Sequence, residues 1–214
     1  MDFEKFVEYC KNKSVAIVGP AQIENSLKEE IDNHDIVVRI NNYERLDPQK
    51  YGSKTDVICF NFYRATPVVS TTNPPEWLLN THRLFFVPDT KEWIDISLVR
   101  NSTIKHSIFP TSENEYNYAN TYKYHTTSGY CVLLNFLQII KHLKKLNIYA
   151  LTLNLTSHYN PNYSDSTGDR MSCHNMKYER EHMKEVIARM DREDKSKLHF
   201  HCEICNSYFK SLEE

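Results

Sequence analysis

Residues 14–42 read SVAIVGPAQIENSLKEEIDNHDIVVRINN, and this stretch decides the fold. It opens with a short, β-branched apolar run at 14–18, continues through a polar, helix-compatible stretch at 22–31 and closes with a second apolar run at 35–40. Strand, turn, helix and strand in this order predict a parallel βαβ unit.

The ends of these two predicted strands carry the first candidate binding residues. Gly19 ends the first strand, and Asn41 follows the second. Parallel sheets bind their ligands beyond the carboxyl ends of the strands. We therefore expect residues 19–22 and 39–42 to line one crevice.

The rest of the chain alternates in the same way. Further strands are predicted at 56–61, 83–87 and 147–153, and helices from Thr127 to about 145 and from Asn175 to Met190. The alternation predicts a single domain, residues 1–214, with a Rossmann-like α/β sandwich built on a parallel sheet. The stretch 64–76 is predicted to be a surface connection, and the tyrosine-rich stretch 111–126 is either a lid at a binding edge or an ordinary surface loop.

Charge and hydropathy exclude two classes of partner. Lys and Arg number 26 and Asp and Glu 28, which leaves a formal net charge of -2. This balance lacks the basic excess of nucleic-acid binders, so we expect no nucleic-acid partner. No apolar run has the length of a membrane span, and the first residues lack the order of a secretory signal. We expect a soluble, cytoplasmic chain with no membrane segment.

The six cysteines are dilute and show no disulfide-scaffold spacing, so we interpret them as mostly reduced thiols. The pair Cys202 and Cys205, with His199 and His201 nearby, has two interpretations. It is half of a zinc site, or it holds the buried thiols of a C-terminal strand. No second pair with metal-ligand spacing is evident, which favours the strand.

Several nucleotide motifs are missing. The turn at Gly19 lacks the second and third glycines of the dinucleotide fingerprint, and the chain has no Gly-x-x-x-x-Gly-Lys-Ser/Thr loop. Nor do two aspartates stand at i and i+2, the arrangement with which many sugar-diphosphate transferases hold a divalent ion. The sequence therefore predicts neither a nicotinamide enzyme nor a nucleotide triphosphatase, and it calls for no metal or other cofactor.

Four motifs, in the correct order, resemble the sialyl motifs of the family 29 glycosyltransferases. The matching segments are residues 14–42 for the large motif, Thr127-Ser128-Gly129 for the small motif, His158-Tyr159 for the third, and His174 with Glu179 for the last, His-x4-Glu. Four motifs in order are far more specific than any one of them. Within the large motif, we expect Asp32, His34 and Asp35 to be structural and to join helix to strand.

The resemblance implies a variant of the GT-A type fold and an inverting, metal-independent transfer of a sugar from a CMP-activated donor to a glycan hydroxyl. It assigns donor contacts to Gly19, Ala21, Asn41, Thr127, Ser128 and Gly129. It makes His174 the base and places His158 on the donor phosphate, with Tyr159 in support. Glu179 is expected to help His174 only if that histidine lies before the helix, because residues five positions apart do not share a helical face.

The chemistry of the two histidines agrees with these roles. A neutral imidazole, with an unperturbed pKa of ~6.5, can take the proton of the attacking hydroxyl as the new bond forms. The departing phosphate gains charge, which His158 and the N–H groups of a helix start near Gly129 would stabilise. A monophosphate leaving group needs less neutralisation than a diphosphate, which fits the missing metal motif.

Two departures from the family narrow the prediction. Pro20 replaces the asparagine that usually follows the large-motif glycine, and Val15 and Ile140 stand where secreted members have a linking disulfide. The second departure favours a reducing compartment over the Golgi lumen. The donor sugar stays open between sialic acid and a Kdo-like acid. The rival interpretations are a bacterial family 42-like sialyltransferase and a catalytically silent nucleotide-binding domain on the same scaffold.

Overall fold

The computed structural model describes residues 3–41, 43–60, 81–87, 106–110, 126–153 and 175–210. In these parts of the chain, seven strands form one sheet in the order β5-β4-β3-β2-β1-β6-β7, and every neighbouring pair is parallel. The strands are β1 (Ser14–Val18), β2 (Ile36–Ile40), β3 (Val57–Phe60), β4 (His82–Val87), β5 (His106–Pro110), β6 (Lys145–Tyr149) and β7 (Leu198–Phe200). The predicted βαβ unit is confirmed.

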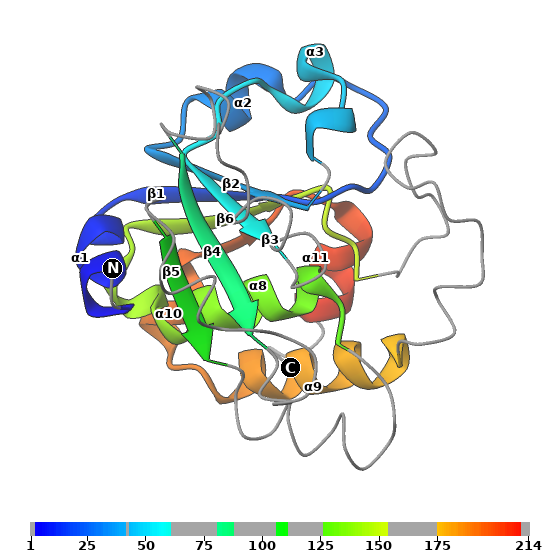
Figure 1. Cartoon of the computed structure of the whole chain (residues 1–214). Helices are drawn as coiled ribbons and strands as arrows, with labels where there is room; N and C mark the ends of the chain where they lie inside the picture. Colours follow the sequence, from blue (N-terminus) through cyan, green and yellow to red (C-terminus); the bar gives the residue numbers. More distant parts are fainter. Residues whose placement is uncertain are drawn as a thin grey trace.

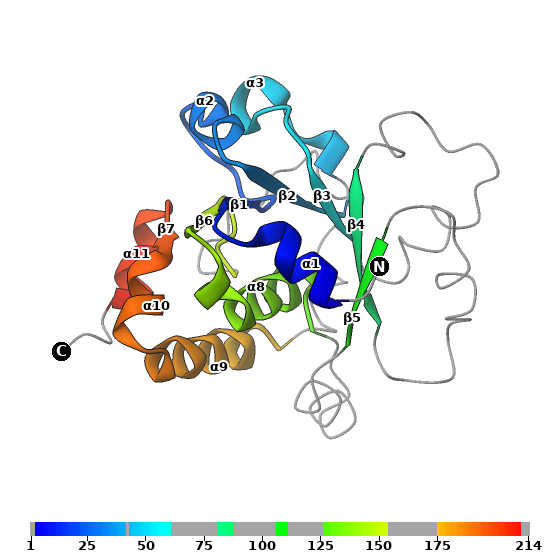
Figure 2. The same cartoon turned by 90° about the vertical axis from the view of Figure 1, so that its left-hand side faces the viewer.

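Helices cover both faces of the sheet (Figures 1 and 2). One face carries α2 (Lys28–Asp32) and α3 (Pro48–Tyr51), and the other carries α1 (Phe3–Cys10) and α8 (Ser128–Gln138), with α9 (Met176–Arg189) packed on α8. The remaining elements are α10 (Arg192–Lys197), α11 (Glu203–Lys210) and the 3-10 turns η1 (Tyr43–Arg45) and η2 (Ile140–His142). This is the parallel α/β sandwich that the sequence predicts.

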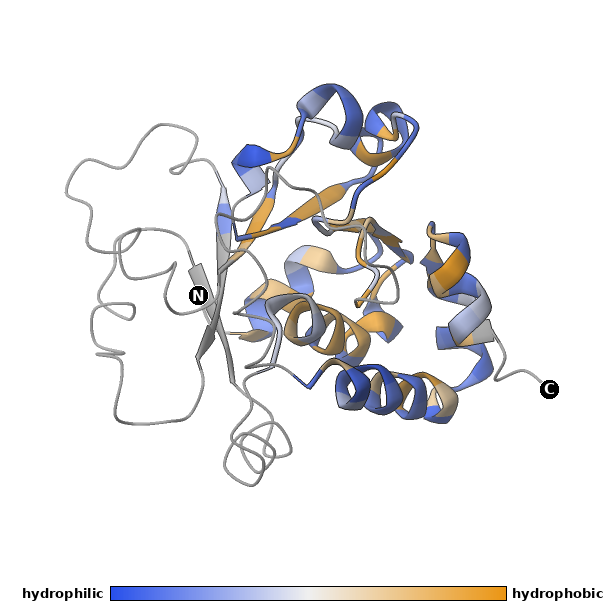
Figure 3. Cartoon of the chain, turned by 90° about the vertical axis from the view of Figure 1, so that its right-hand side faces the viewer, coloured by the Kyte–Doolittle hydropathy of each residue, from blue (hydrophilic) through white to orange (hydrophobic). Residues whose placement is uncertain are grey.

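The sheet is apolar because both of its faces are buried. In β1, Val15 and Ile17 pack into the core beneath α1 and α8, whereas Ala16 and Val18 pack into a second core beneath α2 and α3. A strand covered on both faces gives a continuous apolar run rather than an alternating one. Figure 3 shows this layering, with hydrophobic residues along the central strands and α8 and hydrophilic residues prominent along α9.

The strand order reverses between β1 and β6. From β1 the sheet grows through β2 to β5 on one side, and the chain then returns to add β6 and β7 on the other. In open parallel sheets such a reversal leaves a crevice beyond the carboxyl ends of the two central strands. The segments that follow β1 and β6 are therefore the natural place for a ligand.

Three sequence-based boundaries were wrong. The helix predicted to run from Thr127 to about 145 ends at Gln138, and Lys145 begins β6. The helix predicted at 22–31 begins only at Lys28, because Ser26 Oγ donates to the Gln49 carbonyl oxygen (2.6 Å) and the Leu27 N–H donates to that of Lys50 (2.8 Å). These bonds hold the preceding residues against α3. The strand predicted at 147–153 ends at Tyr149, because Ala150 has a φ of 49°, outside the extended region.

The interpretation of Cys202 and Cys205 as thiols of a C-terminal strand was also wrong. Strand β7 ends at Phe200. Cys202 immediately precedes α11, and Cys205 lies in the first turn of that helix. Of the six cysteines, the five in described segments are free thiols, as expected. No helix in the described segments is long and apolar enough to cross a bilayer. The stretch 64–76 and all of the tyrosine-rich stretch 111–126 except Thr126 lie outside the described residues, so the predictions for them stay predictions.

Candidate functional site

The turn after β1 is pinned to the end of β6. The Gly19 N–H donates to the Tyr149 carbonyl oxygen and the Ala21 N–H to that of Ala150, both at 2.8 Å. A Cβ added at Gly19 would overlap the Ala150 carbonyl oxygen and lie 2.7 Å from the Leu151 Cα, both backbone atoms. Glycine is therefore required here by the close approach of another backbone.

Leu151 links this turn to the start of α8. A Cβ added at Gly129 would lie 2.6 Å from Leu151 Cδ1, so the leucine packs against both Gly19 and Gly129. The side chain is 6% exposed. Sequence reasoning missed Leu151, because nothing local distinguishes it from any other strand-end leucine.

Asn41 joins the end of β2 to α8. Its backbone is in the left-handed region, with a φ of 47°, which asparagine tolerates better than most residues. Its side-chain Nδ2 donates to Ser128 Oγ at 3.0 Å, across 87 positions of sequence. Because the serine oxygen accepts this bond, its own hydrogen, which has no acceptor among the described residues, can be donated to a ligand. The structure thus brings together the two segments to which the sequence assigned donor binding.

The start of α8 is fixed by a buried carboxylate. Thr127 is the N-cap, and its Oγ1 accepts from the Tyr130 N–H at 3.3 Å. Glu179, in α9 and 0% exposed, accepts from the Thr127 N–H at 2.7 Å and from Thr127 Oγ1 at 2.6 Å. Glu179 therefore supports the small motif directly, a partnership that the sequence did not predict.

Removing the Glu179 carboxylate is expected to lower the free energy of unfolding by about 1–3 kcal/mol, because two partly buried donors of Thr127 lose their acceptor. The test compares urea unfolding of Glu179→Ala, Thr127→Val and the double variant. We expect the two changes to be non-additive by at least about 0.5 kcal/mol, since the residues share two bonds. Strict additivity would show that the contact does not support the cap.

Next to this cap, Ser128 and Gly129 begin α8. Within the described segments, the N–H groups of Ser128 and Gly129 have no acceptor. Free N–H groups at a helix start can bind a ligand oxygen. The Glu179 carboxylate offsets part of the positive end of the helix dipole, so directed hydrogen bonds rather than helix charge would hold the ligand.

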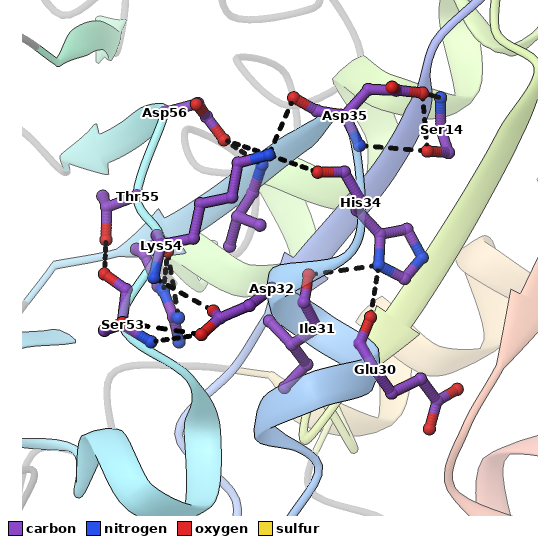
Figure 4. Close-up of polar contacts among 12 residues, drawn as sticks. Ser14, Glu30, Ile31, Asp32, His34, Asp35, Ser53, Lys54, Thr55 and Asp56 are labelled. Atoms are coloured by element: carbon purple, nitrogen blue, oxygen red, sulfur yellow. Dashed lines mark hydrogen bonds and ion pairs between the residues drawn. The ribbon is translucent and has the colours of Figure 1, made fainter.

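The segment between α2 and β2 is structural, as predicted (Figure 4). Asp32 accepts from the N–H groups of Ser53 (3.1 Å) and Lys54 (3.0 Å). Asp35 accepts from the N–H (2.8 Å) and hydroxyl (2.7 Å) of Ser14. Partial burial alone would raise the pKa of Asp32, but the N–H donors lower it on balance, and the Ser14 donors lower the pKa of Asp35. His34 Nδ1 contacts the Glu30 carbonyl oxygen at 2.9 Å.

Arg39 does not line the crevice. The side chain is 2% exposed, and its guanidinium donates to the carbonyl oxygens of Tyr51 (2.8 Å) and Lys54 (3.0 Å). Burial lowers its pKa to about 10, so it stays protonated at neutral pH. The expectation that 39–42 as a whole face the ligand is thus corrected at this position. Tyr51 in turn donates its hydroxyl to the Ala21 carbonyl oxygen at 2.9 Å and steadies the turn after β1.

The remaining predicted site residues are not described. His158, Tyr159 and His174 lie outside the described residues, and their roles stay predictions. Helix α9 begins at Met176, with Asn175 as its N-cap. Where the structure describes side chains, no group of three or more His, Cys, Asp or Glu residues is arranged to hold a metal ion.

Comparisons with known proteins add to this geometry. No protein-family model matches the sequence, and no curated protein matches it. Among solved structures, the monofunctional alpha-2,3-sialyltransferase Cst-I from Campylobacter jejuni aligns with a TM-score of 0.58 and 12% identity over 92% of this chain and 79% of that one. The chain has a sialyltransferase fold. A variant of the sialyltransferase Cst-II, solved in complex with CMP, aligns with a TM-score of 0.52 and 12% identity, covering 91% and 82%.

This sialyltransferase fold confirms the predicted fold class, a Rossmann-like parallel sandwich of the GT-A variant type. The likeness of the backbone and the resemblance of the four sequence motifs are separate observations, because residue identity over the aligned chains is only 12%.

Proposed function

We propose that this chain is a sialyltransferase-like glycosyltransferase. It moves an acidic sugar, sialic acid or a Kdo-like sugar, from a CMP-activated donor to the hydroxyl of a glycan acceptor. The transfer inverts the anomeric centre and uses no metal. The donor nucleotide occupies the crevice where the strand order reverses, between the turn at Gly19 and the start of α8.

The bond between Asn41 and Ser128 carries this proposal. It joins the two motif segments, 87 positions apart in sequence, that the family resemblance assigns to the donor. Gly19 and Gly129 meet around Leu151 at the same edge of the sheet. Ser128 Oγ–H and the N–H groups of Ser128 and Gly129 offer three donors for the oxygens of a nucleotide. The CMP bound to Cst-II, a protein of the same fold, adds independent support.

In the proposed mechanism two histidines act on opposite sides of the reacting carbon. His174 takes the proton of the acceptor hydroxyl, which attacks as CMP departs. His158 donates a hydrogen bond to the leaving phosphate, whose charge grows in the transition state. Inversion follows because the hydroxyl attacks in a single displacement from the side opposite the leaving group.

Selective stabilisation by CMP tests the donor class. A ligand that binds only the native state at a concentration of about 100 times its Kd raises the free energy of unfolding by ~2.7 kcal/mol. We expect thermal unfolding to shift upward with CMP and to shift less with UMP or CDP. Equal shifts with all three nucleotides, or no shift with CMP, would refute the proposal that the donor is a CMP-activated sugar.

A pair of matched variants tests whether the stabilisation by CMP arises from binding beside Asn41. Asn41→Asp keeps a residue that tolerates a φ of 47° but removes the Nδ2 donor, and we expect it to weaken CMP stabilisation. Asn12→Asp is the control. Asn12 also has a positive φ, 59°, but it precedes β1 and so lies at the amino ends of the strands, opposite the proposed site. CMP release from CMP-Neu5Ac or CMP-Kdo then separates an enzyme from a silent binding domain.

A further inference from the structure

Cys202 and Cys205 stand one helical turn apart at the start of α11. Cys202 immediately precedes the helix, and its carbonyl oxygen accepts from the Asn206 N–H at 2.8 Å, which closes the first turn. Residues three apart on such a turn lie on one side of it. Cys202 is partly exposed, Cys205 is buried, and both are free thiols. A partly exposed thiol beside a buried one at a helix start is the arrangement of redox-active Cys-x-x-Cys pairs.

The buried cysteine of this pair contacts Leu151, which in turn packs against Gly19 and Gly129. Cys205 Sγ donates to the Leu151 carbonyl oxygen at 3.7 Å. Leu151 packs so closely against both Gly19 and Gly129 that a Cβ on either glycine would overlap it. A change at Cys205 that moves Leu151 therefore alters the surroundings of these two glycines.

We propose that Cys202 and Cys205 form a redox-active dithiol that exchanges with small-molecule disulfides, such as oxidised glutathione, and that its oxidation displaces Leu151, which packs against Gly19 and Gly129. The exchange itself does not depend on the proposed function. The consequence for the nucleotide does rest on it, because it requires that the donor bind beside Gly19 and Gly129.

The exchange balances in two steps. The Cys202 thiolate attacks one sulfur of the small disulfide, forms a mixed disulfide and releases one thiolate. Cys205 Sγ then attacks Cys202 Sγ and gives up its proton to the departing thiolate, which closes the intramolecular disulfide and releases the second small thiol. The two cysteines lose two electrons and their two thiol protons, and the small disulfide gains both electrons and takes up both protons as two thiols.

The reduced pair keeps its link to Leu151. Burial, with the neighbouring Cys202 thiol, raises the pKa of Cys205 far above its ordinary value, so its S–H stays protonated at neutral pH and remains a donor. Oxidation removes this hydrogen, and the buried Leu151 carbonyl oxygen loses it as a partner. An S–H donor is weak, so the main effect is the pull of the new disulfide on the first turn of α11.

Mass spectrometry tests the exchange. The folded protein is incubated with oxidised glutathione, and its cysteines are then alkylated and mapped. We expect a disulfide between Cys202 and Cys205 that dithiothreitol reverses, and no change at the buried Cys10 and Cys59. The variant Cys205→Ser is expected to hold glutathione on Cys202, whereas Cys202→Ser is expected to stay reduced. Absence of the disulfide in folded wild type, with Cys202 still open to alkylation, would overturn the dithiol.

The four glycines provide the readout for Leu151. Selective ¹⁵N-glycine labelling gives one amide signal for each of the four glycines of the chain. On oxidation, we expect the signals of Gly19 and Gly129 to move while that of Gly52, at the end of α3 on the other face of the sheet, stays fixed. If the disulfide forms and neither crevice glycine responds, the link to the crevice is refuted.

The same samples separate this inference from the proposed function. If the glycine signals respond to oxidation but CMP never stabilises the reduced protein, the dithiol stands and the proposed donor falls. If CMP stabilises the reduced protein but no disulfide forms and the glycine signals do not respond, the proposed donor stands and the dithiol is refuted. When both are correct, oxidation changes the affinity for CMP, and dithiothreitol restores it.

Discussion

Replacing His174 with alanine is expected to slow CMP release from a CMP-sugar by about 10²–10⁴-fold, the usual contribution of a general base. CMP should still stabilise the variant, because the proposed base acts on the acceptor hydroxyl rather than on the nucleotide. The release rate of wild type should also fall as the pH drops below ~6.5, where an ordinary imidazole becomes protonated and can no longer accept a proton.

The measurement is the rate of CMP release at saturating donor, with thermal stabilisation by CMP measured on the same preparations. His142→Ala is a suitable control, because His142 lies in η2, beyond the far end of α8 from Ser128. A His174→Ala enzyme with the full wild-type rate would remove His174 from the role of base. Loss of CMP stabilisation as well would assign it to binding instead.

Replacing Gly19 with alanine is expected to lower the free energy of unfolding by about 1–3 kcal/mol and to abolish stabilisation by CMP. The new Cβ would collide with the backbone of Ala150 and Leu151, which side-chain rotation cannot relieve. The turn after β1 must then separate from the end of β6, where the donor is proposed to bind. Urea unfolding with and without CMP measures both effects.

Gly52→Ala provides the matched control for this prediction. Gly52 has a φ of 77°, and a Cβ there would collide with the Asp32 carboxylate, so this variant should also be destabilised. Its collision lies beside α2 and α3, away from the crevice. We expect Gly52→Ala to keep its response to CMP. If both variants lose the response, the effect is general destabilisation rather than damage to a site at Gly19.

Sequence patterns predicted the elements whose burial is uniform. The strands β1 and β2 are buried on both faces and therefore appear as continuous apolar runs. The helix α8 has eight consecutive buried residues from Tyr130 to Leu137, and its N-cap threonine marks its start in the sequence. For the two strands and for the start of α8, local composition and tertiary position agree, so the sequence was sufficient. The end of α8 at Gln138, well before the predicted 145, did not follow from the sequence.

The features that the sequence did not predict are determined by contacts between residues far apart in the chain. The start of α2 is delayed by bonds to residues more than twenty positions away, and β6 is ended by a non-glycine residue with positive φ, for which no sequence signal exists. The short β7 lies at a sheet edge, where burial is incomplete and the apolar pattern is weak. Each of these depends on partners that local periodicity cannot identify.

The candidate site divides in the same way. That Gly19, Asn41 and Ser128 lie together was predictable, because the motifs resembled those of a known family and the ends of parallel strands meet at one edge of a sheet. The side-chain bond between Asn41 and Ser128 and the packing of Leu151 were not, because they join residues from three separate strand ends and a helix start. The bond from Glu179 to Thr127 likewise required the packing of α9 against α8.

A CMP titration followed through the ¹⁵N-glycine amide signals of the reduced protein tests the central claim most directly. If the nucleotide binds where the strand order reverses, the signals of Gly19 and Gly129 shift together and saturate at one Kd, while that of Gly52 does not move. A titration that leaves both crevice glycines unchanged at millimolar CMP would contradict a CMP-sugar site at this edge of the sheet.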